Sequence, residues 1–327
     1  MGTLTVLPSD ALANAVVLTG PVASRRASDA GSHPQWGLPD GRARDDGQPA
    51  GAFARVFDLV ALGFVVALLL ALQGCAAPAP PPTRTVTLLL APEGRAVTVD
   101  VHEPAGAVRG AAVLSHGFTR SRTTLAGHAQ ALATDGVLAL TVDLPYTFDF
   151  ERNALALGDL VTRLRRTETF GAAVDRVILV GFSAGGLSSL LAARTDGVVG
   201  YVGLDPFDRL HRDRVGALGL DAATQVPVPV LLLRAPPSSC NAQSVAAPWG
   251  RALPRLELDE VIDASSHCDF ESPTDRVCQW ACGAVDPQRQ RHIEQRLREA
   301  ARRWMPDAPS ARSSAAEAPP LTGQRGL

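Results

Sequence analysis

Lysine is absent from this chain of 327 residues, and all 31 of its basic side chains are arginines. Acidic residues number 33, so the formal net charge at pH 7 is only -2. Proteins that bind nucleic acid usually carry a clustered surplus of basic residues, so this composition argues against such a partner. The chain also lacks a P-loop, a Gly-x-Gly-x-x-Gly after a strand, and a set of metal ligands with recognisable spacing. We therefore expect neither a cofactor nor a metal.

The longest apolar run extends from Phe57 to Leu72 and follows Arg55. A run of this length is typical of a signal-peptide core or a short membrane span. The residues Leu72-Gln73-Gly74-Cys75 resemble a bacterial lipobox, although Gln73 stands where a small residue is usual. We expect an exported protein attached to a membrane through lipid on Cys75, facing the periplasm or the cell exterior. Because residues 1–54 precede the run, we expect translation to start downstream of Met1, the alternative being an internal anchor.

Composition divides the chain into four parts. Residues 1–54 mix Gly, Pro, Ser, Asp and Arg without a period, which predicts a disordered extension. Residues 55–83 contain the leader and an extended Ala/Pro spacer. Residues 84–305 have the periodicity of a folded domain, and residues 306–327 are again rich in Ala, Pro and Ser, which predicts a disordered tail.

Cysteine is scarce, with five residues in the chain. Beyond Cys75, four remain at Cys240, Cys268, Cys278 and Cys282, an even number that indicates disulfides in an exported protein. We expect two bridges, and the sequence does not choose among the three possible pairings. Zinc is the alternative, but the C-x9-C-x3-C spacing matches no known site. We expect the segment 265–282 to have little regular structure of its own and to be braced by these bridges.

Apolar strands alternate with helices through residues 84–305. A hairpin is predicted at Thr85–Leu90 and Ala96–Val101, around Glu93-Gly94. Further strands are predicted at Gly110–Leu114, Gly136–Val142, Val177–Val180, Val198–Leu204, Val228–Leu233 and Leu256–Ile262. Helices are predicted at Leu125–Ala133, Asn153–Arg166 and Gln288–Trp304, the second with Leu155, Leu160 and Leu164 on one side. This alternation predicts an α/β fold whose central sheet is mostly parallel and has helices on both faces.

The clearest chemical signal lies where the strand Val177–Val180 runs into Gly181-Phe182-Ser183-Ala184-Gly185-Gly186. Small and apolar residues at helical spacing follow at once. A Gly-x-Ser-x-Gly sequence between a strand and a helix is a nucleophile elbow, whose sharp turn presents a serine hydroxyl. We interpret Ser183 as a nucleophile. The alternative is a glycine-rich connection that happens to contain a serine.

The order of these elements, with the elbow on the central strand and a histidine near the end, resembles the α/β-hydrolase superfamily from about Arg84 to Trp304. The elbow together with Gly203-Leu204-Asp205-Pro206 and Ser266-His267 is similar to the chlorophyllase and dienelactone-hydrolase-like esterases. The resemblance implies an α/β-hydrolase fold and cleavage of a small-molecule ester through a Ser-Asp-His triad and an acyl-enzyme.

A serine nucleophile needs a base that takes its proton. In this superfamily the acid and then the histidine follow the serine, which leaves His211, His267 and His292. His211 comes soon after the elbow in a charged segment, and His292 lies in the predicted terminal helix. His267 follows the last predicted strand and is the candidate base, the alternative being a histidine of a surface loop.

The candidate acid is inferred from the absence of Asp and Glu in the loop where many α/β-hydrolases carry it. Many α/β-hydrolases carry it after the strand that corresponds to Val228–Leu233, but residues 234–255 contain neither Asp nor Glu. Asp205 ends the preceding strand at the same sheet edge as Ser183, and the chlorophyllase-like members carry an acid there. Asp208 is the second candidate, Asp143 comes too early, and a turn or cap role is the alternative for Asp205.

Acyl transfer also needs donors for the oxyanion. The amide of Ala184 is one candidate, and the resemblance places the other at Phe118, after His116-Gly117. We expect His116 to shape that loop, whose alternative interpretation is an ordinary strand-end turn. The same triad serves acyltransferases and peptidases, and a non-catalytic surface lipoprotein that uses the fold as a scaffold is the alternative from another class. The chain has no long insertion between Ser183 and Asp205 and only a modest one at Phe207–Gln225, so we expect no large lid, which favours small or exposed esters.

Overall fold

The computed structural model describes residues 80–307, apart from 167–169, 171–172 and 213–214. The predicted N-terminal extension, the leader with Cys75 and the tail from residue 308 lie outside the described residues. Among the described helices, none is both long enough and apolar enough to cross a membrane.

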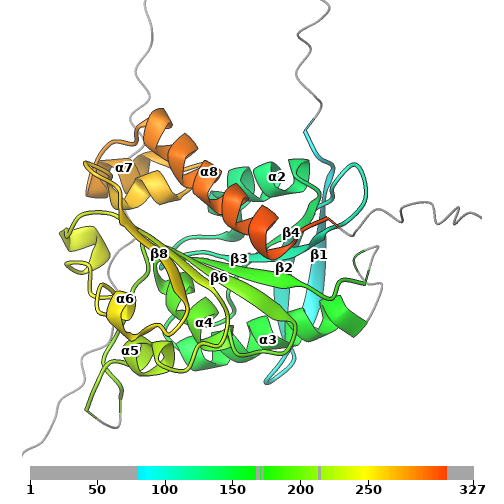
Figure 1. Ribbon diagram of the computed structural model, residues 1–327, viewed down its shortest axis with the longest axis horizontal. Helices are drawn as coiled ribbons and strands as arrows, with labels where there is room; N and C mark the ends of the chain where they lie inside the picture. The colour runs from blue at the N-terminus through cyan, green and yellow to red at the C-terminus, as the bar shows by residue number, and fades with distance from the viewer. Residues whose placement is uncertain (1–79, 167–169, 171–172, 213–214, 308–327) are drawn as a thin grey trace, which may run out of the picture. The chain divides into compact units, whose positions relative to one another are not determined.

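The described residues form an eight-stranded sheet with the order β1-β2-β4-β3-β5-β6-β7-β8 (Figure 1). The strands are β1 Thr83–Leu90, β2 Arg95–His102, β3 Gly110–Ser115, β4 Val137–Val142, β5 Val177–Phe182, β6 Val198–Leu204, β7 Val230–Arg234 and β8 Leu256–Val261. β2 pairs antiparallel with both β1 and β4, and all other neighbours are parallel. The parallel arrangement brings the carboxyl ends of β3 to β8 to one edge of the sheet.

Helices cover both faces of the sheet, which is why β3, β4 and β5 are buried along their whole length and consist almost entirely of apolar residues. α2 (Ala126–Thr134) and α8 (Pro287–Trp304) lie on one face in Figure 1, and their Leu132 and Leu297 join one hydrophobic core. α3 (Phe150–Arg166), α4 (Ala184–Ala192), α5 (Leu218–Ala223) and α6 (Trp249–Ala252) contribute to a second core. The predicted α/β class with a mostly parallel, doubly covered sheet is confirmed.

Two expectations about individual segments were wrong. Leu155 is 56% exposed, while Leu160 and Leu164 of the same helix are fully buried. The segment 265–282 is also more regular than expected, since it contains the short helix η4 (His267–Phe270) and α7 (Arg276–Cys282). Asp275 caps α7 by accepting a hydrogen bond from the backbone N–H of Cys278 at 2.8 Å.

Candidate active site

Ser183 occupies a sharp turn between β5 and α4. Its backbone angles are φ 52° and ψ -119°, and its N–H donates to the Leu204 carbonyl at 3.0 Å. A positive φ is strained for a residue with a side chain and persists only where the surroundings enforce it. The geometry is that of a nucleophile elbow, as the Gly-x-Ser-x-Gly sequence predicted.

Glycines allow this turn because three backbone segments meet there. A Cβ on Gly181 would lie 2.5 Å from the Gly185 carbonyl oxygen, and one on Gly185 would collide with the Ser115 carbonyl at the end of β3. A Cβ on Gly117 would lie 3.0 Å from the Cβ of Ser183. The loop that carries Phe118 therefore runs directly against the serine.

Asp205 and His267 form a short hydrogen bond at the same sheet edge. Phe182 and Leu204 are register partners, so Ser183 and Asp205 follow neighbouring strands at the same level. His267 Nδ1 lies 2.6 Å from Asp205 Oδ2, and the carboxylate is only 2% exposed. The bond makes Nδ1 the donor, which leaves Nε2 of His267 as the nitrogen that can accept a proton.

The second oxygen of Asp205 has two donors of its own. Oδ1 accepts from the Ala235 N–H at 3.0 Å and from Asn241 Nδ2 at 3.3 Å. Asn241 is itself fixed, because its Oδ1 accepts from the N–H groups of Ser238 at 2.9 Å and Ser244 at 3.0 Å. The loop after β7 has no carboxylate, and it provides an amide that orients the carboxylate of the neighbouring strand. Asn241 was not predicted from the sequence, because only acidic residues were considered in that loop.

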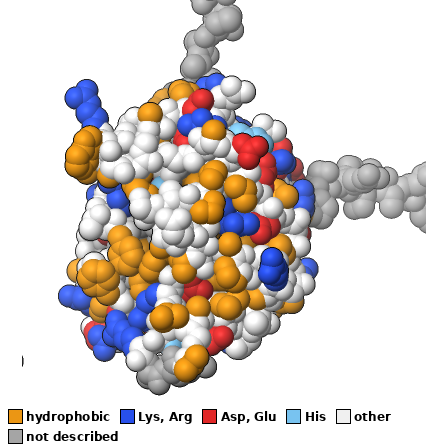
Figure 2. All heavy atoms as spheres, turned by 90° about the vertical axis from the view of Figure 1, so that its left-hand side faces the viewer, with side chains coloured by type: hydrophobic (Ala, Val, Ile, Leu, Met, Phe, Trp, Pro, Cys, Tyr) orange, Lys and Arg blue, Asp and Glu red, His pale blue; other side chains and the backbone are white. Residues whose placement is uncertain are grey.

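Ser183 and His267 open into the same cavity of about 230 Å³, which we call the α7 cavity. Its walls include Phe118, Val277 and Ala281. The ring of Phe182 packs on the imidazole of His267 at a centroid distance of 4.6 Å. Figure 2 shows the face of the molecule on which α5, α6 and α7 lie in Figure 1, and hydrophobic side chains occupy much of it.

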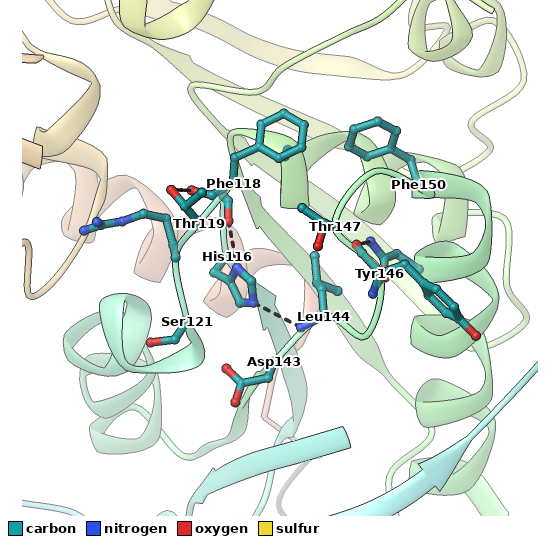
Figure 3. A pocket seen from close by; sticks show the side chains of 13 residues that line it. His116, Phe118, Thr119, Ser121, Asp143, Leu144, Tyr146, Thr147 and Phe150 are labelled. Carbon is teal, nitrogen blue, oxygen red and sulfur yellow. Dashed lines mark hydrogen bonds between the residues drawn. The ribbon is translucent and has the colours of Figure 1, made fainter. Parts of the chain in front are cut away.

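A second cavity of about 400 Å³, which we call the β4 cavity, lies beside the loop that follows β4 (Figure 3). His116, Phe118, Leu144, Tyr146, Phe150 and Ala184 are among its lining residues. Residues 118–120 line both cavities. The loop with the predicted second oxyanion donor therefore borders both.

His116 shapes this loop, as expected. Its Nε2 accepts from the Leu144 N–H at 3.0 Å, so its Nδ1 carries the proton and donates to the Gly117 carbonyl at 2.8 Å. Burial lowers the pKa of His116, which favours this neutral form. Both ring nitrogens have backbone partners, so His116 fixes the Gly117-Phe118 turn.

A buried ion pair joins this loop to the segment that carries His267. Arg120 donates from Nε to Glu271 Oε1 at 2.5 Å and from Nη2 to Oε2 at 2.7 Å, and its Nη1 donates to Asp275 at 3.0 Å. The Glu271 side chain is fully buried, and its hydrogen bond is the main cause that raises the pKa of Arg120. The two residues are 151 positions apart, and the sequence gives no sign that they meet.

The two expected disulfides are present, and they pair Cys240 with Cys282 and Cys268 with Cys278. Cys268 is the neighbour of His267. The sulfurs of Cys268, Cys278 and Cys282 lie within 4.8 Å of one another, but each is bonded to another sulfur. The bridges join α7 to η4 and to the loop after β7, and so connect the histidine segment to the loop that orients Asp205.

The other acidic candidates have different partners. Asp208 accepts from the N–H groups of Gly219 at 2.7 Å and Leu220 at 2.9 Å, and from Trp249 Nε1 at 2.7 Å. These bonds hold the start of α5 against α6. Asp143 pairs with Arg122 at 2.7 Å.

The other histidines downstream of Ser183 are also engaged elsewhere. His211 Nε2 lies 2.9 Å from Asp221, and His292 Nε2 lies 2.8 Å from Glu260. Of the three, only His267 shares a cavity with the serine. The predicted set of Ser183, Asp205, His267, Phe118 and Ala184 is thus brought together at one edge of the sheet.

No protein-family model and no curated protein sequence matches the chain. Solved structures do resemble it. A dienelactone hydrolase from Anabaena variabilis has a TM-score of 0.52 at 21% identity, over 69% of this chain and 99% of that one. The esterase domain of a Rhodothermus marinus protein has a TM-score of 0.51 at 18% identity, over 68% and 99%. An esterase from Pyrococcus furiosus has a TM-score of 0.51 at 15% identity, over 69% and 92%.

Identities this low show the fold and do not by themselves assign a substrate or an activity to this chain. The order of the elements along the chain, the serine between β5 and α4 and the mostly parallel sheet agree with the sequence-based expectation. This chain has the fold of the α/β-hydrolases.

Proposed function

We propose that this protein is a serine hydrolase that cleaves carboxylic esters of small molecules through an acyl-enzyme on Ser183. The observation that carries the proposal is the 2.6 Å bond between His267 and Asp205, in a cavity that also contains the serine of a nucleophile elbow. The likeness to structures described as a dienelactone hydrolase and esterases agrees with it.

In the first half of the reaction, Ser183 Oγ attacks the ester carbonyl carbon while His267 Nε2 takes its proton. Asp205 accepts the Nδ1–H of the same ring, which fixes the tautomer and stabilises the imidazolium. The carbonyl oxygen becomes negative, and the amides of Ala184 and Phe118 are the proposed donors to it. When the C–O bond to the alcohol breaks, His267 gives the proton to the departing oxygen.

In the second half, a water molecule attacks the acyl carbon, and His267 takes its proton. The bond to Ser183 breaks, the acid leaves, and the proton returns to the serine oxygen. His267 takes up and releases a proton in both halves of the reaction. The tautomer that Asp205 imposes on His267 is therefore needed for acylation and again for deacylation.

Replacing the nucleophile gives the direct test. Ser183→Ala should abolish ester hydrolysis and labelling by a fluorophosphonate probe while the thermal midpoint changes little, because one hydroxyl is removed from a turn of small residues. Asp205→Asn should lower kcat by about 10⁴-fold, as in other triads. Asp208→Asn is the matched control and should have a small effect on kcat. Unchanged turnover in Ser183→Ala would refute the proposal, and wild-type protein that does not react with the probe would favour a non-catalytic scaffold.

We also propose that the protein is exported and anchored to a membrane by lipid on Cys75. The support is the apolar run before that cysteine, the lipobox-like residues and the two disulfides, which suit an oxidising compartment. Labelling of cells with a fatty-acid analogue should mark the wild-type protein and not Cys75→Ala. Equal labelling of both would contradict the anchor.

A further inference from the structure

We propose that the β4 cavity binds the acyl group of the ester and the α7 cavity binds its alcohol group. The assignment rests on the proposed function and extends it to the substrate class. It follows from which cavity contains the base.

The histidine determines where the alcohol must lie. His267 has to donate a proton to the departing alcohol oxygen, so that oxygen must be within hydrogen-bond reach of Nε2. His267 lines the α7 cavity and is not among the residues that line the β4 cavity. The alcohol group therefore points between Phe182 and α7, toward Val277 and Ala281.

The oxyanion donors determine where the acyl group lies. The trigonal carbonyl carbon holds its oxygen, its alcohol oxygen and its acyl carbon in three different directions. With the carbonyl oxygen at the amide of Ala184 and the alcohol at His267, the acyl carbon points away from the base. Ser183 lines the α7 cavity, Ala184 lines the β4 cavity, and Phe118 lines both. An acyl group on Ser183 that points away from His267 passes Phe118 and Ala184, and the cavity that these two residues share also has Leu144 and Phe150 in its wall.

The volumes and lining residues of the two cavities indicate the size and the chemical character of the substrate. The β4 cavity, at about 400 Å³, falls within the range of roughly 300–1,000 Å³ that encloses a drug-sized ligand, and the α7 cavity of about 230 Å³ falls below it. Phe118 and Phe150 lie edge to face with ring centroids 5.7 Å apart in the wall of the β4 cavity (Figure 3). Aromatic walls favour an aromatic acyl group.

Charged side chains in the cavity walls are already paired. Arg120 binds Glu271 and Asp275, and Asp143 binds Arg122. An ionised substrate group would have to compete with these pairs. The geometry points to neutral esters in which an aryl-alkanoic acid is joined to a short alcohol.

Two isomeric esters test this assignment with the same atoms. Methyl phenylacetate places the ring on the acyl side, and benzyl acetate places it on the alcohol side, with alcohols of similar acidity. We expect kcat/KM to favour methyl phenylacetate by at least about tenfold, the size of effect that a misplaced hydrophobic group has in a shaped pocket.

Tryptophan substitutions, one in each cavity, then test which cavity binds the acyl group and which binds the alcohol group. Leu144→Trp keeps the backbone N–H that His116 needs and fills the β4 cavity, so it should lower the preference for methyl phenylacetate. Val277→Trp, at a side chain that is 68% exposed, narrows the α7 cavity and should raise that preference. Leu89→Trp on the distant edge strand β1 is the control, with a 62% exposed side chain and no expected change in the preference.

Hydrolysis of the acyl-enzyme tests the acyl-binding cavity alone, because the alcohol has already left and only the acyl group remains bound. In stopped-flow measurements with p-nitrophenyl phenylacetate, Leu144→Trp should change the deacylation rate by at least about tenfold. Val277→Trp should change only the acylation rate. A preference for benzyl acetate, or slower deacylation in Val277→Trp alone, would overturn the assignment. Probe labelling without cleavage of either ester would overturn the substrate class, and wild-type protein without labelling would refute the proposed function itself.

Discussion

His128 is expected to make the fold less stable as the pH falls, because its imidazole is fully buried in α2. Its Nε2 lies 3.1 Å from the Phe270 carbonyl, and its Nδ1 has no partner among the described residues. The ring is therefore neutral, with the proton on Nε2. Burial lowers the pKa of His128 from 6.5 to about 4. A second proton would put a charge and an unpaired N–H in the core.

The direction of the pH effect on stability follows from comparing the protonation of His128 in the folded chain with that in the unfolded chain. Between pH 6.5 and about 4 the unfolded chain binds more protons than the folded chain, so the free energy of unfolding falls as the pH falls. The stabilising effect of the neutral ring is complete above pH 6.5 and is lost as the pH approaches 4. At about 1.4 kcal/mol for each pH unit, the loss is on the order of 3 kcal/mol. That is a large part of the 5–15 kcal/mol typical of a folded domain.

Urea unfolding of the oxidised protein at several pH values between 7.5 and 4 measures this loss. The reference is His128→Gln, whose side-chain amide can donate to the same Phe270 carbonyl but does not titrate. The difference in unfolding free energy between the two proteins should shrink by on the order of 3 kcal/mol across this range, in favour of the variant at low pH. A difference that stays constant with pH would refute the reasoning, because other titrating groups affect both proteins equally.

Three further predictions concern the residues around the triad. Asn241→Ala removes a donor to Asp205 and should lower kcat by at least about tenfold with a smaller change in KM, which steady-state kinetics would show; an unchanged kcat would contradict its positioning role. Glu271→Gln removes the fully buried carboxylate from Arg120, which keeps Asp275 at 3.0 Å, and should cost about 1–3 kcal/mol in urea unfolding, whereas an unchanged free energy of unfolding would contradict a stabilising role for the pair. Reduction of the Cys240–Cys282 and Cys268–Cys278 bridges, worth about 2–4 kcal/mol each, should lower activity before circular dichroism reports loss of the sheet; four free thiols in unfolded, unreduced protein that starts at Ala76 would exclude this.

Local patterns were sufficient to predict the strands and the strand–turn–helix around Ser183, and they also led to Asp205 as the candidate acid. β5 is a continuous apolar run bounded by glycines, and Ser183 stands where the run meets a helix. Asp205 could be inferred because the loop after β7 has no carboxylate, which left the end of β6. Each of these arguments needs only neighbours in the chain or the order of parallel strands.

Contacts between distant segments could not be predicted in this way. Arg120 and Glu271 are ordinary charged residues in sequence, and only the fold brings them together in the interior. The pairing of the cysteines likewise depends on where α7 lies. Leu155 was wrongly placed because five positions at 3.6 residues per turn put it about 140° around the helix axis from Leu160, so it faces solvent.

Ser183 and Asp205, the proposed nucleophile and acid, are attached to the fold differently from His267, the proposed base. Ser183 and Asp205 extend from paired central strands, and backbone hydrogen bonds of the sheet fix their relation. His267 lies in a segment with no strand pairing of its own, whose attachments are side-chain and loop contacts: the disulfides, the ion pairs Arg120–Glu271 and Arg289–Asp269, the His128–Phe270 bond, and the backbone bonds that Ser272 makes with Thr124 and Gly127.

Segments with few backbone bonds to the sheet open at lower free energy than core strands. The amides of β5 and β6 should therefore exchange with solvent deuterium only through global unfolding, and those of η4 and α7 through a smaller, local opening. A molecule in the locally open state keeps its sheet, its serine and its carboxylate but has no base in reach. Heat should thus inactivate the protein reversibly below its melting temperature, and cooling alone should restore it.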